Sequence, residues 1–384
     1  MASVSATPHG HPPYGATRAD FFYRKVIITM MNAKLVAAEL QRTAAKTRVF
    51  LSMPYIQGLT PQCMERPDLH AFTDAQGFER RDGIFKLHEA GLSPLDHGNL
   101  YGDAVFEGIR IDNRRILMLK EHVDRWIHSA QRLEIPFPYS RAQLCDILVQ
   151  LTKAALDAQG TSGYLRPVLT RGMGNLGVNP AKCIAPSLYI VASSITLYPP
   201  ERYQQGIDVT IARHIRRNDA RFLDPNIKTN NYLNNVFALL ETRHSGALET
   251  LMLTHDGYVA EATADNLFVA EHIEDKNILK VPAPQYALVG LTRQLVLNAA
   301  QKLGFHIIED AHMLPTDLIG PTREVFITGT ACGLMPVLSI DGLPTAPPDK
   351  RPLIQQLSQT MTSLALLEQN SFDIDSGNLE HYLL

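Results

Sequence analysis

One lysine in this chain stands where covalent chemistry could use it. Lys228 follows a Pro-containing turn, Asp224–Ile227, and precedes an amphipathic helix. The apolar face of that helix is predicted to contain Leu233, Val236, Phe237 and Leu240. A lysine is costly to bury as a cation, so at this place it either extends its amine to water or takes part in a reaction. Both interpretations stay open on this segment alone.

Other segments supply an acid and groups that bind anions. Glu261 follows a hairpin whose turn is Asp256-Gly257. Gly290–Arg293 opens a helix and Gly329–Ala331 follows a strand, and both turns offer backbone N–H groups and hydroxyls to an anion. Arg125 lies off the apolar stripe of the helix predicted over Glu121–Leu133, where an arginine is ordinarily solvent-exposed.

An anionic heterocycle that carries an aldehyde would use all of these groups. The lysine would form a Schiff base, the acid would keep a ring nitrogen protonated, and the turns with the arginine would hold a phosphate. Each feature alone is common. The usual nucleotide-binding and hydrolase motifs, G-x-x-x-x-G-K-[ST], G-x-G-x-x-G after a strand and G-x-S-x-G, are absent from the sequence.

A second pair of polar residues suits a carboxylate. In the strand predicted over Tyr164–Arg171, alternation places Tyr164 and Arg166 on one face. Arginine binds carboxylates through two parallel hydrogen bonds, so this face could hold an acidic group. An arginine on an edge strand that pairs with an acid of the protein remains the alternative.

Composition excludes several classes of partner. The 384 residues suffice for two or three domains, and 45% hydrophobic with 20% charged residues is ordinary for a globular protein. A net charge of −3 gives no electrostatic reason to expect nucleic acid or an acidic membrane. Four cysteines without a C-x-x-C pair argue against a disulfide framework or a zinc site and fit a reducing compartment. No apolar run is long enough to span a bilayer.

The chain can be divided by how regularly helix and strand patterns recur along it. Residues 1–76 read as an N-terminal extension that can be partly disordered, with a helix near Asn32–Lys46 and a mildly transit-peptide-like charge balance. We expect a small α+β domain over 77–196 and a linker over 197–205, which contains Pro199-Pro200. A large domain should follow over 206–346, and a C-terminal helix and tail over 347–384.

Several segments, in this order and spacing, resemble the class IV aminotransferases of fold type IV over about residues 77–345. They are Tyr101–Arg110, Tyr164–Pro167, Asn175–Pro180, Ile227–Asn235, Glu261–Phe268, Gly290–Arg293 and Gly329–Ala331. Within that family, Val105–Arg110 and Tyr164–Pro167 look most like the branched-chain aminotransferases. The resemblance implies an α+β fold of two α/β domains, with pyridoxal 5'-phosphate bound between them.

The resemblance also implies roles for individual residues toward the cofactor. Lys228 would form the Schiff base and, once displaced by substrate, would move the substrate α-proton. Glu261 would pair with the pyridine nitrogen, and Tyr232 would hydrogen-bond the phenolic oxygen of the ring. The phosphate would be bound by Arg125, Leu291, Thr292 and Thr330.

Substrate roles follow from the same resemblance. The hydroxyl of Tyr164 and the N–H groups of Thr330 and Ala331 would receive the α-carboxylate, and Arg166 the distal carboxylate of glutamate. The residues expected to line the apolar side-chain pocket are Tyr101 and Phe106. Behind that pocket we expect Arg110 to be paired with Asp265, because each charge near apolar walls needs a partner.

The function so implied is transfer of the amino group between branched-chain L-amino acids and 2-oxoglutarate. A D-amino acid or (R)-amine transaminase and a 4-amino-4-deoxychorismate lyase of the same fold remain alternatives, although Tyr164 with Arg166 weighs against the first. We expect a homodimer or higher oligomer in the cytoplasm, with import into an organelle through the N-terminal extension kept open.

Overall fold

The computed structural model describes residues 33–310 and 312–383. The chain divides into two compact units, Met1–Lys46 and Thr47–Leu384. In the first unit, residues 33–44 are helical, which agrees with the helix predicted near Asn32–Lys46. The expectations for residues 1–32, including their disorder and their targeting role, lie outside the described residues.

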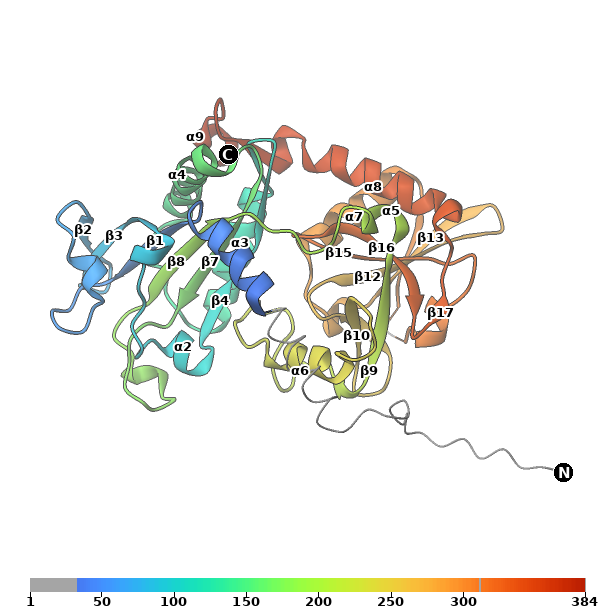
Figure 1. Cartoon of the computed structure of the whole chain (residues 1–384), viewed down its shortest axis with the longest axis horizontal. Helices are drawn as coiled ribbons and strands as arrows, with labels where there is room; N and C mark the ends of the chain where they lie inside the picture. The colour runs from blue at the N-terminus through green and yellow to red at the C-terminus, as the bar shows by residue number, and fades with distance from the viewer. Residues whose placement is uncertain (1–32, 311, 384) are drawn as a thin grey trace. The chain divides into compact units, whose positions relative to one another are not determined.

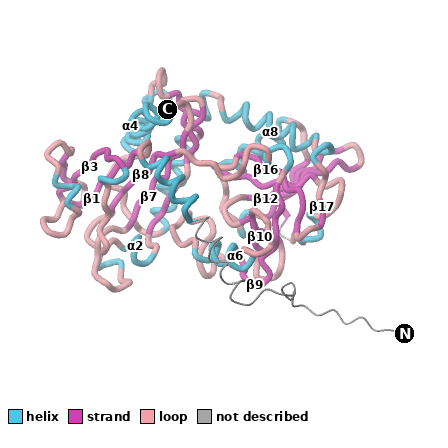
Figure 2. The backbone as a smooth tube through the Cα atoms, viewed as in Figure 1, coloured by secondary structure: helices cyan, strands magenta, loops and turns pink. Residues whose placement is uncertain are grey.

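The second unit is built on two nine-stranded sheets, and Figure 2 shows its strands gathered in two groups. The first sheet has the order β18-β6-β5-β7-β8-β1-β3-β2, and β4 pairs with β7. Its strands are β1 (Arg48–Pro54), β2 (His70–Thr73), β3 (Glu79–Lys86), β4 (Ala104–Phe106), β5 (Ile109–Asp112), β6 (Arg115–Leu117), β7 (Gly163–Thr170), β8 (Ser187–Ser193) and β18 (Ser371–Asp373).

Helices α3 (Leu119–Arg132) and α4 (Arg141–Gln159) pack with this sheet around one apolar core, which includes the buried Trp126. Helix α3 lies close to the bounds predicted for it, Glu121–Leu133. The side chain of Ser140 caps the start of α4 in a reciprocal capping box with Gln143, and Gly160 follows its end. The remaining helices near this sheet are α2 (His97–Tyr101) and α9 (Leu379–Leu383).

One expectation about the chain ends is wrong. Residues 48–76 are not part of an extension, because β1 pairs with both β3 and β8 inside the first sheet. In the tail that follows the C-terminal helix, β18 pairs antiparallel with β6. The side chains of Phe372 and Ile374 join the core of the first sheet, which provides the apolar contact that holds the tail there.

The second sheet has the order β11-β10-β9-β16-β15-β12-β13-β14, and β17 pairs with β16. Its strands are β9 (Ile207–Arg216), β10 (Glu249–Leu253), β11 (Val259–Ala262), β12 (Asn266–Ile273), β13 (Lys276–Pro282), β14 (His306–Asp310), β15 (Glu324–Gly329), β16 (Gly333–Ile340) and β17 (Leu343–Pro344). The predicted hairpin at Asp256-Gly257 is confirmed by the antiparallel pairing of β10 and β11.

Helices α7 (Leu291–Lys302) and α8 (Pro352–Ala365) share an apolar core with this sheet, and Figure 1 shows α8 running over it. Between the sheets, the linker contains α5 (Arg202–Gln205). Helix α6 (Leu233–Thr242) follows the lysine, but the predicted apolar face is not buried. Leu233, Val236, Phe237 and Leu240 are 62%, 45%, 49% and 45% exposed.

Single-turn 3-10 helices complete the described part of the chain. They are η1 (Gln62–Glu65), η2 (Leu87–Glu89), η3 (Pro180–Lys182), η4 (Pro284–Tyr286), η5 (Pro315–Leu318), η6 (Pro348–Lys350) and η7 (Glu368–Asn370). None of the described helices has both the length and the apolar content needed to cross a membrane.

Candidate active site

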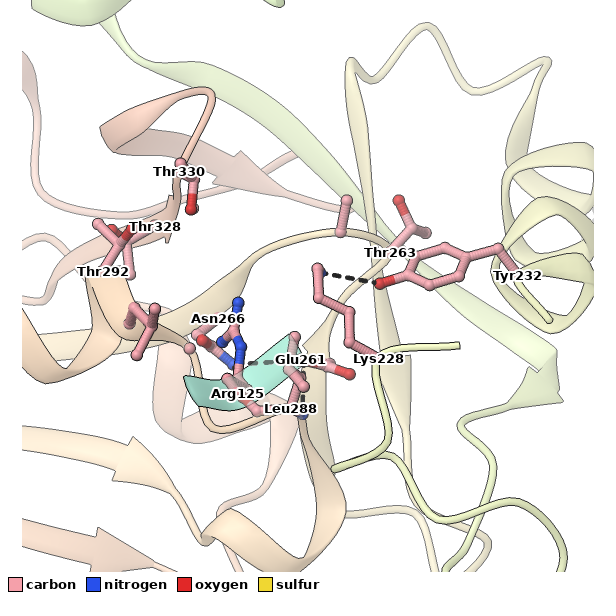
Figure 3. Close-up of a pocket in the computed structure, with 14 residues that line it drawn as sticks. Arg125, Lys228, Tyr232, Glu261, Thr263, Asn266, Leu288, Thr292, Thr328 and Thr330 are labelled. Carbon is pink, nitrogen blue, oxygen red and sulfur yellow. Dashed lines mark hydrogen bonds between the residues drawn. The ribbon is translucent and has the colours of Figure 1, made fainter. Parts of the chain in front are cut away.

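A cavity with an open volume of about 440 Å³ brings distant segments together (Figure 3). Every residue predicted to bind the cofactor lines it: Arg125, Lys228, Tyr232, Glu261, Leu291, Thr292 and Thr330. Thr263, Asn266, Leu288, Gly290 and Thr328 also contribute to the wall.

The backbone of Lys228 is fixed by the first sheet and by α3. Its carbonyl accepts a hydrogen bond from the Phe106 N–H at 2.9 Å, and its own N–H donates to Ser129 Oγ at 3.2 Å. The amine Nζ lies 3.5 Å from Tyr232 Oη and 4.6 Å from the centre of the Phe106 ring. The structure records no ion pair for this amine among the residues it describes, so the amine remains available for reaction.

Glu261 is a buried carboxylate in the wall of the same cavity. Arg217 Nε donates to its Oε1 at 2.6 Å, while Asn266 Nδ2 and the Leu288 N–H donate to Oε2, each at 3.3 Å. Burial raises the pKa of the Glu261 carboxyl, and the charge of Arg217 opposes that rise. Arg217 was not predicted, and its position at the end of a strand gave no signal of this contact.

Arg125 faces the cavity rather than bulk solvent because Glu107 holds it. Its Nε and Nη2 donate to the two Glu107 oxygens at 2.7 and 2.8 Å, and its Nη1 donates to the Val289 carbonyl at 2.9 Å. His122 Nδ1 lies 2.8 Å from the same carboxylate. Burial would raise the pKa of Glu107, but Arg125 and His122 hold the pKa well below its usual range. Glu107 lay within the recognised Val105–Arg110 segment, yet its role was missed.

The start of α7 offers its N–H groups to the cavity. No side chain caps this helix, whose first residues, Leu291 and Thr292, line the wall. Uncapped N–H groups and the helix dipole favour an anion there. At Gly290 an added Cβ would overlap Asn266 Oδ1, so only glycine lets the turn approach this closely.

The predicted substrate residues divide into two groups. Phe106, Tyr164 and Arg166 lie together: the Arg166 guanidinium carbon is 4.7 Å from the centre of the Phe106 ring, and its Nη2 is 3.4 Å from Tyr164 Oη. The Tyr164 hydroxyl occupies the space where a side chain at residue 108 would be, because an added Cβ at Gly108 would overlap it.

Neither Phe106, Tyr164 and Arg166 nor the second group, Tyr101, Arg110 and Ala331, lines this cavity. Of the predicted substrate residues, Thr330 is the one in its wall. Tyr101 Oη donates to the Leu176 carbonyl in the loop after β7. Arg110 lines a neighbouring cavity. Ala331 follows Thr330 in the turn between β15 and β16 and is half-buried.

The predicted ion pair between Arg110 and Asp265 is wrong, because none is recorded among the described residues. Asp265 instead accepts a hydrogen bond from the thiol of Cys332, with Sγ 3.3 Å from Oδ1. Burial raises the pKa of Asp265 to about 7, with the neighbouring Glu249 adding to the effect. The carboxyl group can therefore take up a proton in place of a cationic partner.

The donor set fits pyridoxal phosphate. An amine without an acidic partner, a buried carboxylate and an anion cradle formed by Arg125 and the α7 N-terminus meet in one cavity. Lys228, Glu261 and the cradle would hold the aldehyde, the ring nitrogen and the phosphate.

We expect Glu107→Gln to weaken cofactor binding and stability together. The change leaves the Arg125 cation buried without its counter-charge, which costs roughly 3–5 kcal/mol. Equilibrium dialysis should show reduced affinity for pyridoxal phosphate, and denaturant unfolding should show the lost stability. Asp124→Asn is the matched control, since Asp124 lies next to Arg125 on α3 in an exposed ion pair with Arg141, worth at most about 1 kcal/mol. Equal effects of the two substitutions would contradict the role of Glu107.

Comparison with known proteins supports one family. The amino-transferase class IV family model matches residues 104–340. A Methanocaldococcus jannaschii protein, whose name places it among the branched-chain-amino-acid aminotransferases, is 37% identical over 255 residues, 66% of this chain and 84% of its own length. The D-alanine aminotransferase of Listeria monocytogenes is 30% identical over 280 residues, 72% of this chain and 91% of its own.

A solved structure agrees with these sequence relatives. A branched-chain amino acid aminotransferase from T.th., complexed with N-(5'-phosphopyridoxyl)-L-glutamate, superposes with a TM-score of 0.68 at 28% identity. The similarity covers 76% of this chain and 96% of that one. The chain therefore belongs to the class IV aminotransferases and is a pyridoxal-phosphate-dependent transaminase.

Proposed function

We propose that this transaminase exchanges the amino group between branched-chain L-amino acids and 2-oxoglutarate. The observation that carries the proposal is the grouping of an apolar ring, Phe106, with the guanidinium of Arg166 close to the amine of Lys228. The ring offers contact to an apolar side chain, and the guanidinium offers a partner to the distal carboxylate of glutamate or 2-oxoglutarate. The two kinds of substrate could therefore use one pocket in turn.

Bound pyridoxal phosphate supplies a carbonyl group that takes up the amino group and a ring that accepts the electron pair released at the substrate α-carbon. Lys228 Nζ holds the cofactor at rest and then transfers the proton of the α-carbon as a base. Glu261 keeps the proton on the ring nitrogen through its charge, and Tyr232 orients the ring through its hydroxyl. Arg125, Thr292 and Thr330, with the Leu291 N–H, neutralise the phosphate.

The α-carboxylate needs its own partners on the other side of the reacting carbon. We assign it to the Tyr164 hydroxyl and to the N–H groups of Thr330 and Ala331. Their support is the place of Tyr164 above Gly108, where no side chain can displace the hydroxyl, and the presence of Thr330 in the cavity wall.

Arg166→Leu should separate the two kinds of substrate. Loss of the guanidinium removes a charge-assisted contact to the distal carboxylate, so we expect KM for glutamate to rise by about tenfold or more, while KM for leucine changes little. Steady-state kinetics with both amino donors measure this. Arg166→Lys, which keeps the charge, should retain part of the preference for glutamate. An equal rise in both KM values would exclude this role.

The similarity to a D-alanine aminotransferase keeps the opposite stereochemistry as the second candidate. A panel of amino donors that includes both enantiomers of leucine, alanine and glutamate distinguishes the two functions. Faster turnover of the D-enantiomers would replace the proposal. A chorismate-derived substrate in the same panel tests the lyase activity that this fold also supports.

We further propose that the protein forms a homodimer through the exposed face of α6. Leu233, Val236, Phe237 and Leu240 leave the largest apolar side chains of this helix open to solvent. Monomeric proteins rarely expose such contiguous apolar surface, and a self-complementary patch near a two-fold axis would cover it. We also propose a cytoplasmic location, which the four free thiols support.

The double substitution Phe237→Glu with Leu240→Glu should convert the dimer to a monomer in sedimentation velocity. Two charges of the same sign placed in an apolar interface lose hydration and repel their copies across the two-fold axis. Leu343→Lys, at an exposed leucine of the short strand β17, is the control and should leave the oligomeric state unchanged. A wild-type protein that sediments as an active monomer would refute the dimer.

We propose the domain division of this transaminase as a small domain on the first sheet and a large domain on the second, joined by the linker 197–205. The support is that each sheet has its own apolar core. Limited proteolysis in the linker should give two protected fragments on a denaturing gel, held together in the native protein by the pairing of β18 with β6. Cleavage spread evenly over both sheets would oppose the division.

A further inference from the structure

A second cavity adjoins the cofactor site, with an open volume of about 840 Å³. The two cavities share Thr292, Gly329 and Thr330. Lys228 lines only the first cavity, and the far wall of the second is formed by α8, on which no predicted site residue lies. A molecule bound in the second cavity would therefore contact the phosphate-binding turn from behind, away from the reactive amine.

The floor of this second cavity is apolar. Leu117, Leu295, Leu334 and Met361 reach it from β6, α7, β16 and α8. All four belong to, or pack against, the core cluster that α7 and α8 share with the second sheet. A branched aliphatic side chain gains favourable burial against such a floor, and the flexible Met361 can adapt to its shape.

Two side chains of opposite charge also line the second cavity. Arg110 and Asp112 lie two residues apart on β5, so both side chains project from one face of the strand, and both line the cavity. Among the described residues, neither forms an ion pair with the other or with a third side chain. Asp112 Oδ1 accepts a hydrogen bond from Ser162 Oγ at 3.2 Å, and Arg110 Nη1 lies near the backbone at Gly333.

We propose that the second cavity binds an apolar α-amino acid as an effector. Its carboxylate would pair with Arg110, its ammonium group with Asp112, and its side chain would lie on the apolar floor. A zwitterion satisfies both charges at once, whereas an apolar acid or amine would leave one of them unpaired. The bound amino acid is not a substrate, because its amino group faces Asp112 and not Lys228.

This site is coupled to the reaction by the residues that both cavities share. Thr330 lies in the wall of each, and it is one of the residues proposed above to neutralise the phosphate. An occupant of the second cavity would bias the position of that turn, and by reciprocity the cofactor would bias the affinity for the amino acid.

The test uses the full chain with its first cavity filled. N-(5'-Phosphopyridoxyl)-L-glutamate, the compound in the related solved complex, should occupy the cofactor and substrate positions. Calorimetric titration of this filled enzyme with L-leucine should still show one binding event per chain, while 4-methylpentanoate and 3-methylbutylamine should bind at least about tenfold more weakly. No binding of L-leucine to the filled enzyme overturns the proposal, even where the transaminase activity is confirmed.

Two substitutions connect the binding event to the cavity. Asp112→Asn should lower the affinity for L-leucine by about tenfold or more and leave the affinity for 4-methylpentanoate unchanged, because only the partner of the ammonium group is lost. Met361→Trp should abolish the event by filling the floor. Asp349→Asn and Gln359→Trp, both at exposed positions, are the matched controls and should bind as wild type. Unchanged L-leucine affinity in Asp112→Asn refutes the proposal, whether or not the tryptophan variant folds.

Discussion

Lys228→Ala should abolish transamination. The substitution removes the amine that holds the cofactor and moves the substrate α-proton, and no other lysine lines the cavity in the described part of the chain. Loss of covalent catalysis together with the positioned base is expected to lower kcat by at least about 10⁴-fold. The visible absorbance of bound pyridoxal phosphate should shift, and borohydride should no longer fix the cofactor to the chain.

The readouts for this variant distinguish lost chemistry from lost structure. The Lys228 backbone hydrogen bonds to Phe106 and Ser129 do not depend on its side chain, so the thermal transition should stay close to that of wild type. Peptide mass mapping after borohydride treatment of the wild type should find the cofactor on residue 228. Lys280→Ala is the control. Lys280 lies on β13 and forms an ion pair with Glu271 on β12, and the variant should keep full activity. A cofactor mapped to any other lysine would remove Lys228 from the mechanism.

Local periodicity in the sequence predicted individual helices well. The helix predicted over Glu121–Leu133 agrees with α3 to within two residues at each end, because the spacing of apolar residues is a local signal. Periodicity also predicted the apolar face of α6, but not its exposure. A period of 3.6 shows that a face is apolar and says nothing of what covers it, so the sequence alone left the packing of α6 open.

Long-range contacts were the part that the sequence did not reveal. Strand β18 pairs with β6 from more than 250 residues away, as the partners Ser371 and Leu117 show, and a three-residue strand carries almost no periodic signal. Glu107 and Arg217 were likewise missed as partners of Arg125 and Glu261. A charged residue beside a recognised motif does not reveal which opposite charge the fold will bring to it.

The error at Arg110 has a different cause. We expected two charges near apolar walls to neutralise each other, but Asp265 is buried beside a thiol and another carboxyl group, where its pKa rises to about 7. Protonation is an alternative to ion pairing when a carboxyl group is desolvated. Arg110 was thereby left with its charge in the second cavity, where the proposed effector site uses it.

Glu261→Gln should keep the cofactor bound but slow the proton-transfer step by about 10²-fold or more, because a neutral amide cannot hold the proton on the ring nitrogen as a carboxylate does. The shape of the side chain and one acceptor oxygen are retained. The deficit should appear as a lowered kcat and as an increased deuterium isotope effect with α-deuterated amino donor. Wild-type rates in the variant would overturn the role of Glu261 as the ring's counter-charge.

The Glu261→Gln substitution also removes the counter-charge of Arg217. Its guanidinium donates to Glu261 Oε1 at 2.6 Å, so the amide also leaves a part-buried cation without its counter-charge and some stability will be lost. Glu249→Gln is the matched control: Glu249 is similarly buried, receives hydrogen bonds from Thr250 and Thr263, and does not line the cavity. It should keep the isotope effect of wild type. If proton transfer slows in Glu261→Gln alone, the cause is the lost negative charge at the ring nitrogen. If it slows equally in both variants, the cause is a general loosening of the second sheet.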